Sequence, residues 1–334
     1  MPPKQQYTHP WHEPTVSRSR DMKIAIVGAG AMGSLFGGLL AERGHSVTLI
    51  DVNVAHLEAI RANGLRLHTD DGDRHIHALQ ACQPSQAEGS PDLMLVFTKT
   101  LHTASALAGV AHLIGADTHV LSLQNGLGNV EVIQRHVAPS RILIGVTTWP
   151  ADLVGPGYVH SHGQGVVRLM SADGSEHPML AKVVQALVDA GLACTADPAV
   201  WTAIWEKVAF NAALNSICAV SHCTVDQLGV INDGYDLAYS VVEEVLAVAQ
   251  AQGIAVDQDA CAARVTDAIS RHVGHKPSML QDVLAGRKTE VEAINGAVVA
   301  AAERSGIPVP CTRTLLRLVR LVEARIASAT TTPH

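Results

Sequence analysis

The pattern of hydrophobic and polar positions divides the chain into two parts. Between residues 22 and 198, short apolar runs bounded by Gly, Pro or Asn alternate with amphipathic stretches, which is typical of parallel strands connected by helices. From 199 to 330 the strand pattern ends, and long Ala, Val and Leu patterns of helical period follow. We therefore predict an α/β domain at 22–198 and an all-α domain at 199–330.

The first strand, turn and helix contain the parts of a dinucleotide site. An apolar strand leads into GAGAMG at 28–33, an amphipathic helix follows, and a second strand ends on Asp51. In such a unit Gly28 permits the tight turn, Gly30 lets a pyrophosphate approach, and Gly33 lets the helix pack on the strand. We predict a Rossmann-type dinucleotide-binding domain; the alternative is a glycine turn that only satisfies packing. The predicted cofactor contacts here are Gly28, Ala29, Gly30, Ala31, Met32 and Gly33.

Asp51 favours NAD(H) over NADP(H) as the cofactor. A carboxylate at the end of the second strand can accept hydrogen bonds from both ribose hydroxyls of NAD. A 2′-phosphate about 4 Å away would meet a repulsion of up to about 4 kcal/mol at an effective dielectric constant of 20. The next residues, Val52 and Asn53, offer no compensating cation. A solvated Asp without influence on selectivity is the alternative.

Two further apolar strands end on polar residues. DLMLVFTKT ends near Lys99 and THVLSLQNGLG ends near Asn125, where a parallel sheet presents its carboxyl edge. Both are candidates for cofactor contact, although ordinary loops also favour such residues. The segment 141–170 has the pattern of one more strand, a Pro/Gly connection and a hairpin, which we expect to extend the sheet at its far edge.

One helix of the second part carries a polar stripe on an otherwise apolar surface. In WTAIWEKVAFNAALNS at 201–216, Lys207, Asn211 and Asn215 recur every four residues and therefore lie along one side of a helix. Because buried amides need hydrogen-bond partners, the row is either internally satisfied structure or the lining of a polar cleft. A lysine that extends to water is the ordinary alternative for Lys207.

The segment SMLQDVLAGRKTEVEAING at 278–296 has the pattern of two helix starts separated by a break at Gly286. With two helices, Ser278 and Glu290 can converge on one small ligand. Each would lie in a helical first turn, where a hydroxyl and free backbone N–H groups suit a substrate carboxylate. The alternatives are a plain N-cap and an acid favoured by the helix dipole. The two predicted capping boxes are Ser278 with Gln281 and Thr289 with Glu292.

Composition narrows the class of protein. The 334 residues, 47% of them hydrophobic, can form two domains with sizeable cores. The formal net charge of -7 indicates no nucleic-acid partner, and the apolar runs are too short or too interrupted for a membrane span.

The scattered cysteines and the start of the chain indicate the compartment. The six cysteines lack a CxxC pair, so we predict no metal site and a reducing environment. Residues 1–21 are polar and lack the apolar stretch of a signal peptide. We expect a disordered leader at 1–21 on a cytoplasmic protein, for which Met22 could be the natural start.

Four separated motifs resemble the ketopantoate reductases (2-dehydropantoate 2-reductases) from Met22 to about residue 325. They are GAGAMG at 28–33, LQNGLG at 123–128, WEKVAFNAALN at 205–215 and SMLQDVLAGRKTEVEAING at 278–296. The last two are specific, whereas the first is shared by many dehydrogenases. The resemblance implies a Rossmann domain joined to a helical domain. It also implies an active site in the cleft between them that reduces 2-dehydropantoate to pantoate on the path to pantothenate.

The resemblance also implies the roles of individual residues. Lys207 is similar to the family's proton donor to the keto oxygen, and Glu290 to the group that contacts the reacting hydroxyl and the cofactor side. Asn211 and Asn215 are similar to substrate ligands, and Ser278 to the ligand of the substrate carboxylate. The implied cofactor contacts are Lys99, Asn125, Ala151 and Glu290, and Asn125 could also reach the substrate.

One departure from the family leaves alternatives open. Many members place an arginine just after the second strand to hold a 2′-phosphate, whereas this chain has LIDVN. An NAD-dependent D-2-hydroxyacid dehydrogenase or branched 2-oxo acid reductase is therefore the alternative. A non-catalytic NADH sensor and a β-hydroxyacid dehydrogenase, which has a similar Lys-x-x-x-Asn helix, are more distant ones. The apolar helix RTLLRLVRLVEARIA could cover the core or form the face of a homodimer.

Overall fold

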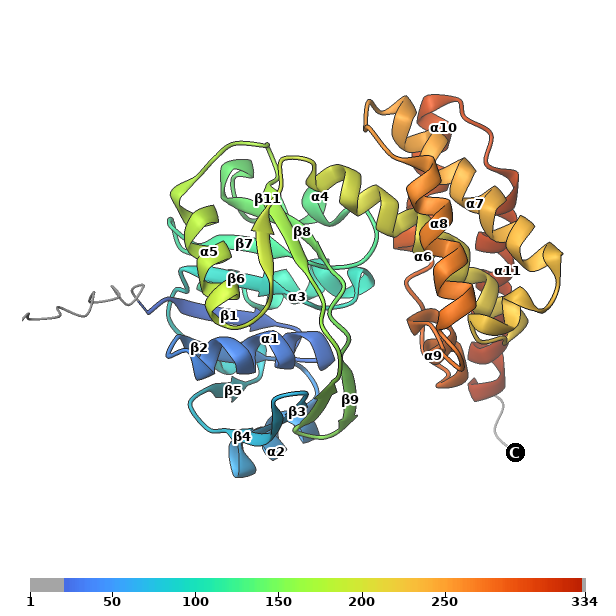
Figure 1. Cartoon of the computed structure of the whole chain (residues 1–334). Helices are drawn as coiled ribbons and strands as arrows, with labels where there is room; N and C mark the ends of the chain where they lie inside the picture. Colours follow the sequence, from blue (N-terminus) through green and yellow to red (C-terminus); the bar gives the residue numbers. More distant parts are fainter. Residues whose placement is uncertain (1–20, 332–334) are drawn as a thin grey trace, which may run out of the picture.

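The computed structural model describes residues 21–331 and consists of an α/β body and a helical body (Figure 1). The helix α6 (Val200–Ser221) leads from the first body into the second. This arrangement confirms the fold class expected from the hydrophobic pattern. The expected leader lies outside the described residues except for Asp21, and the domain boundary between 198 and 199 stays a prediction.

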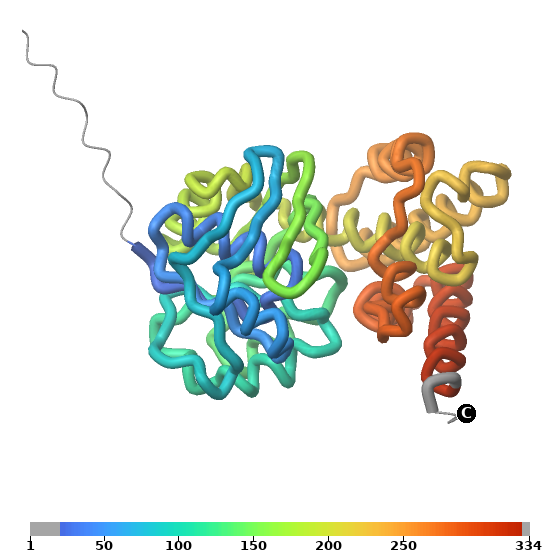
Figure 2. Tube along the Cα trace, turned by 90° about the horizontal axis from the view of Figure 1, so that it is seen from below, coloured from blue at the N-terminus to red at the C-terminus, as the bar shows by residue number. Residues whose placement is uncertain are grey.

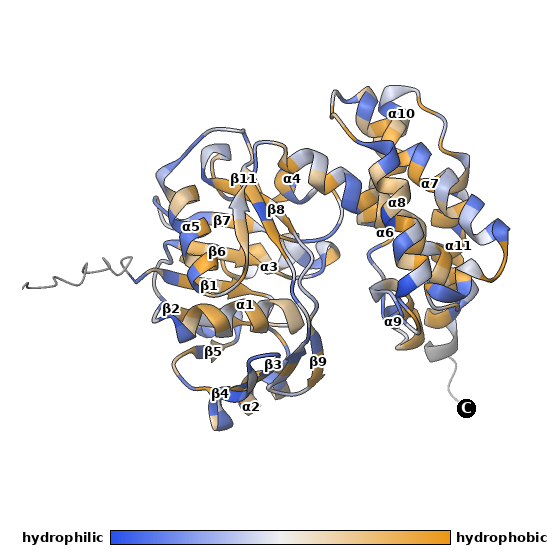
Figure 3. Cartoon of the chain, in the orientation of Figure 1, coloured by the Kyte–Doolittle hydropathy of each residue, from blue (hydrophilic) through white to orange (hydrophobic). Residues whose placement is uncertain are grey.

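The core of the α/β body is an eight-stranded sheet in the order β12-β11-β8-β7-β6-β1-β2-β5. The strands from β8 to β5 are parallel to their neighbours, and β11 runs antiparallel to β8. The central strands are apolar on both faces because helices cover both, as parallel sheets require (Figure 3). The strands are β1 (Lys23–Val27), β2 (Ser46–Ile50), β5 (Gln80–Cys82), β6 (Leu93–Val96), β7 (His119–Ser122), β8 (Ile142–Thr147), β11 (Val167–Ser171) and β12 (Cys194–Ala196). The helices are α1 (Ala31–Glu42), α2 (Val54–Asn63), α3 (Thr103–Gly109), α4 (Asn129–Ile133) and α5 (Pro178–Asp189).

A second, four-stranded sheet corrects one expectation. We expected the hairpin of β9 (Asp152–Gly155) and β10 (Tyr158–Ser161) to extend the main sheet, and this expectation was wrong. Of the segment 141–170, β8 and β11 belong to the main sheet. Instead β10 pairs in parallel with β3 (Leu65–Thr69), which pairs with β4 (Gly72–Ile76). The two hairpins lie side by side in Figure 2. We call these four strands the small sheet.

The small sheet forms because one of its faces is apolar and needs a partner. Leu65, Leu67 and Val159 are fully buried. A Cβ placed at Gly38 of α1 would lie within 3.0 Å of the side chains of Leu65 and Leu67, so helix and sheet pack very closely. The opposite face of the small sheet is polar, as expected for a sheet with one solvated side.

The helical body is built around α6, which packs on α7, α9 and α11. Its other helices are α7 (Asn232–Ala251), α8 (Gln258–Arg271), α9 (Ser278–Leu284), a π-helical turn (Glu292–Gly296), α10 (Ala297–Ser305) and α11 (Pro310–Thr331). Among residues 21–331, no helix has both the length and the hydropathy that crossing a membrane requires.

The break at Gly286 is confirmed, but neither predicted capping box forms. Gly286 follows α9 with a φ of +66°, a conformation that glycine adopts without strain. Ser278 is the first residue of α9, with Pro277 as N-cap, and makes no capping hydrogen bond. Thr289 instead donates from its hydroxyl to Glu323, and Glu292 accepts from Arg320. Glu323 and Arg320 both lie on α11, so contacts with a distant helix replace the hydrogen bonds of the second predicted capping box.

Candidate active site

The loop at 28–33 has the geometry that a dinucleotide needs. Gly28 has a φ of +94°, and a Cβ there would lie 2.5 Å from the backbone nitrogen of Thr98. A Cβ at Gly33 would lie 2.0 Å from the carbonyl oxygen of Gly28, so helix and turn touch through backbone alone. At Gly30, the N-cap of α1, a Cβ would meet no heavy atom within 4 Å, which leaves this side open to a ligand. Ala29 is buried, and Ala31 and Met32 begin α1.

A cavity of about 530 Å³ lies beside this loop. Asp51 borders it directly after β2, and its Oδ1 accepts a hydrogen bond from the backbone nitrogen of Asn53 at 2.9 Å. Within residues 21–331, the other carboxylate oxygen makes no hydrogen bond, so it is available to a ribose hydroxyl. The polar residues that line the cavity are Asp51, Thr98, Lys99, His102 and Ser105.

Lys99 connects the cavity wall with the helical body. Its Nζ lies 2.6 Å from Oδ1 of Asp282 and donates to the carbonyl oxygen of Lys288 at 3.3 Å. Asp282 is only 4% exposed and also pairs with Arg287 at 3.0 Å. Lys99 thus borders the cavity and also holds the two bodies together through a buried carboxylate.

Glu290 lies across the junction of the two bodies. Its Oε1 accepts from the backbone nitrogen of Thr100 at 3.0 Å, and its Oε2 accepts from Nδ2 of Asn125 at 3.4 Å. The hydroxyl of Thr100 donates to the carbonyl oxygen of Asn125 at 2.9 Å. These contacts bring a carboxylate of the helical body to the carboxyl ends of β6 and β7, the edge at which open α/β sheets bind ligands.

Lys207 lies on α6 at the same junction. Its Nζ donates to the carbonyl oxygen of Thr147, the last residue of β8, at 2.8 Å. Burial lowers the pKa of Lys207 to about 8, and the negative charge of Glu290 opposes part of that fall. The side chain therefore does not extend freely to water. An ammonium with this pKa holds a proton at neutral pH and releases it far more readily than an exposed lysine.

Asn211 and Asn215 continue the stripe from Lys207 along α6. They are 8% and 6% exposed, yet neither side-chain amide has a hydrogen-bond partner among the described residues. Their side-chain oxygen and nitrogen atoms are not fully enclosed and keep some exposed surface. Hydrogen bonds within the described residues therefore satisfy Lys207 but not the two amides of the stripe. The two amides are free to bind a small polar ligand.

Two expected residues have no direct contact with this group. Ser278 is exposed at the start of α9, and its hydroxyl has no hydrogen-bond partner among the described residues. Ala151 lies in the loop just before β9 and is half-buried. Their roles as ligands of the substrate and the cofactor stay predictions, as do the roles of the residues described above.

Sequence reasoning missed three residues of the junction. Thr100 contributes a backbone N–H and Thr147 a backbone carbonyl, which no side-chain pattern reveals. Asp282 could have been found, because a lone acid four residues after Ser278 falls on the same side of that helix.

The fold and the arrangement of the site are those of a two-domain, dinucleotide-binding oxidoreductase. The family model described as ketopantoate reductase PanE/ApbA matches residues 24–174, and its C-terminal counterpart matches residues 199–323. The 2-dehydropantoate 2-reductase of Streptococcus pyogenes serotype M1 is 36% identical over 91% of this chain and 98% of its own length. That of Halobacterium salinarum is 33% identical over 90% and 99%. The chain belongs to the ketopantoate reductase family.

Solved structures share the whole architecture. A ternary structure of D-mandelate dehydrogenase with NADH and anilino(oxo)acetate has a TM-score of 0.87 and 32% identity, covering 92% of this chain and 100% of that one. A 2-dehydropantoate 2-reductase from Geobacter metallireducens has a TM-score of 0.84 and 30% identity, covering 89% and 99%. One of these proteins is thus named for mandelate and the other for 2-dehydropantoate.

Proposed function

We propose that the protein reduces 2-dehydropantoate to pantoate with a nicotinamide dinucleotide. The observation that carries the proposal is Lys207, whose ammonium is anchored on the carbonyl of Thr147 and whose pKa is lowered to about 8 beside Glu290. Relatives named 2-dehydropantoate 2-reductase span nearly the whole chain and support this substrate. Reduction on the path to pantothenate follows from the same family names.

The chemistry of the junction suits the reduction of a 2-oxo acid. The dinucleotide, when bound, supplies a hydride. As negative charge develops on the substrate oxygen, the ammonium of Lys207 stabilises it and transfers a proton to it. Asn211 and Asn215 offer free amides to the acid, and Asn125 and Ser278 can complete its binding. Glu290 orients Asn125 and, through its charge, supports the protonated form of Lys207.

We infer that NAD(H) is preferred over NADP(H). Asp51 borders the cavity and has a carboxylate oxygen free for a ribose hydroxyl. The D-mandelate dehydrogenase structures, similar over 91–92% of this chain, contain NADH. The loop at 28–33 would bind the pyrophosphate, and Lys99, Asn125, Ala151 and Glu290 complete the proposed cofactor contacts.

Replacing Lys207 by methionine tests the proposal, since methionine keeps most of the side-chain volume and removes the ammonium. We expect kcat with 2-dehydropantoate and NADH to fall by about 10²- to 10⁴-fold. The dissociation constant of NADH, measured by fluorescence titration, should change little. Turnover equal to that of the unmodified protein would remove Lys207 from the mechanism. NADH binding without turnover of any 2-oxo acid by the unmodified protein would favour a sensor.

A second candidate is an NAD-dependent D-2-hydroxyacid dehydrogenase. It is favoured by the TM-scores of 0.87 and 0.83 to two D-mandelate dehydrogenase structures and by Asp51. The two functions differ in the side chain of the substrate. Comparing kcat/KM for 2-dehydropantoate, its analogue without the hydroxyl, and phenylglyoxylate separates them. A ketopantoate reductase should favour the first by about 10²-fold or more, because a polar pocket rejects a ligand that leaves its groups unpaired.

Three further expectations stay proposals. A homodimer could form on α11, where Leu318 and Leu321 are exposed, and sedimentation equilibrium would measure its mass. The proposed cytoplasmic location rests on the scattered cysteines and on the polar residues 1–21, and the proposed absence of a nucleic-acid partner rests on the net charge of -7.

A further inference from the structure

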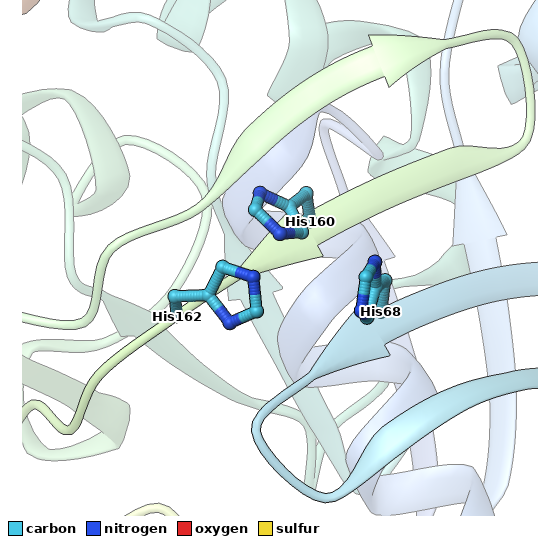
Figure 4. A group of neighbouring side chains, drawn as sticks. All are labelled: His68, His160 and His162. Atoms are coloured by element: carbon cyan, nitrogen blue, oxygen red, sulfur yellow. The ribbon is translucent and has the colours of Figure 1, made fainter.

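The polar face of the small sheet carries three neighbouring histidines that the proposed function does not use. His160 on β10 and His68 on β3 are paired residues of the parallel register, so their side chains lie on one face. His162 follows two residues later and returns to that face. The ring centroids are 3.9 Å apart for His160 and His162, 5.0 Å for His68 and His160, and 5.2 Å for His68 and His162 (Figure 4).

The three imidazoles present nitrogen atoms to a common point. One ring nitrogen of each histidine lies within 4.8 Å of those of the other two, and in Figure 4 the rings surround a shared space. Imidazole nitrogen is a preferred ligand of zinc, copper and nickel ions. Three such ligands are also the protein set of several open, three-ligand zinc sites.

Asp70 fixes the proton on one of these rings. Nδ1 of His162 donates to Oδ1 of Asp70 at 2.7 Å, and Oδ2 of Asp70 accepts from the backbone nitrogen of Gly163 at 2.8 Å. Because a carboxylate can only accept, Nδ1 carries the proton and Nε2 of the neutral ring keeps its lone pair. A carboxylate behind the imidazole is the support that metal-binding histidines characteristically have.

The charges on this face favour a cation. Asp152 on β9 is the antiparallel partner of His160 and shares its face. The neighbouring cation, Arg66, is already held by Asp73 at 3.0 Å and lies 4.2 Å above the ring of Tyr158. An ion among the three histidines would therefore lie near two carboxylates, with Asp152 on the same face of the sheet and Asp70 behind the ring of His162.

We propose that His68, His160 and His162 bind one divalent transition-metal ion, with Zn²⁺ as the ion to test. Tetrahedral zinc holds nitrogen ligands at about 2.0–2.1 Å, which places them about 3.3 Å apart. Nitrogen separations of up to 4.8 Å must therefore close by up to about 1.5 Å. The ring of His162, half exposed just beyond the end of β10, can rotate to do so.

The ion would link β3 and β10, two strands distant in sequence, and so brace the junction of the two hairpins. The cysteine spacing predicted no metal site, and the pairing of His68 with His160 has no local signature in the sequence. The ordinary alternative is three solvated histidines on the polar face of a sheet, in a chain that contains 18.

Calorimetric titration of the chelator-treated full chain with zinc chloride tests the proposal. We expect one ion per chain with a dissociation constant in the micromolar range or below. H160A should weaken binding by at least about 10-fold, and D70N by about 10-fold, because second-sphere carboxylates contribute on that scale. H77Q, which removes an exposed histidine of the same body outside the cluster, should leave zinc binding unchanged.

Two further measurements keep the result unambiguous. Zinc should raise the Tm of the unmodified chain and of H77Q but not that of H160A, because an ion bound to the folded state stabilises it. A variant with H9Q and H12Q controls for the two histidines before residue 21 and should bind as the unmodified chain does. Absence of binding, or equal affinity and stoichiometry in H160A and the unmodified chain, would overturn the proposal. None of these readouts depends on enzymatic activity.

Discussion

The loop at 28–33 and the junction around Lys207 are built in opposite ways. The loop is a continuous stretch of chain whose function depends on absent side chains: Gly28 and Gly33 approach other backbone atoms too closely for any Cβ. The junction collects side chains and backbone groups from the loops after β6 and β7, from β8 and α6, and from the segment after Gly286. The first is therefore determined locally, whereas the second exists only when both bodies are folded and in contact.

This difference separates recognition of a common cofactor from the choice of reaction. A dinucleotide phosphate needs open backbone N–H groups, which one strand, turn and helix supply. Proton transfer needs a charged group whose pKa depends on burial and neighbouring charge. For Lys207, both the buried position and Glu290 come from contacts between elements far apart in sequence.

Enlarging a glycine of the loop should have the largest effect. In G33V, the added atoms would overlap the carbonyl of Gly28, so we expect the free energy of unfolding to fall by about 3 kcal/mol or more and NADH binding to be lost. G30A is the matched control, because a Cβ there meets no atom within 4 Å. Its Tm should remain nearly unchanged while NADH binds more weakly. Equal stability of both variants, measured by urea unfolding, would contradict the close packing at Gly33.

Removing the buried charge of Asp282 should have the second largest effect, a loss of stability at the junction of the two bodies. Asn at 282 cannot balance Lys99 and Arg287, so we expect D282N to lower the free energy of unfolding by about 1–3 kcal/mol. D267N is the control, since Asp267 pairs with Arg271 on an exposed helix surface and should contribute less than about 0.5 kcal/mol. A D282N protein as stable as D267N in urea would show that this contact does not hold the bodies together.

Asp51 should have the smallest effect, on the choice between the two cofactors. Removing its carboxylate in D51A abolishes the repulsion of a 2′-phosphate, so the ratio of kcat/KM for NADPH to that for NADH should rise by about 10- to 100-fold. Steady-state rates with the two cofactors measure it. D92N, which changes an acid that accepts from the backbone of Lys23 instead, should leave the ratio unchanged. An unmodified protein that already prefers NADPH would contradict the role of Asp51.

Much of the fold could be predicted because its signals are local. The central strands are continuous apolar runs, α1 follows a glycine turn, and α6 has a long helical period. The small sheet could not be predicted, since β10 pairs with a strand almost a hundred residues earlier and no local pattern states that register. The capping box of Thr289 with Glu292 was wrong because Glu323 and Arg320 of α11 bind these two side chains. The box of Ser278 with Gln281 was wrong because α9 begins at Ser278 itself, and Gln281 donates to the carbonyl oxygen of Lys276 instead.

The same distinction applies to the site. The stripe of Lys207, Asn211 and Asn215 was visible because a helix repeats its faces regularly. The groups that position Lys207 and Glu290 were not, because the carbonyl of Thr147 and the N–H of Thr100 belong to the backbone. Sequence thus indicated which side chains carry chemistry, and the three-dimensional contacts supplied what tunes them.

The pH dependence of kcat for 2-oxo acid reduction tests the central claim, that Lys207 supplies the proton. Its pKa is lowered to about 8, and only the protonated form can donate. The rate should therefore be maximal below this pH and fall as pH rises through about 8. In E290Q the fall should begin at lower pH, because the charge that favours the ammonium is gone. A rate that stays constant well above pH 8, or a fall that persists unchanged in K207M, would contradict the claim.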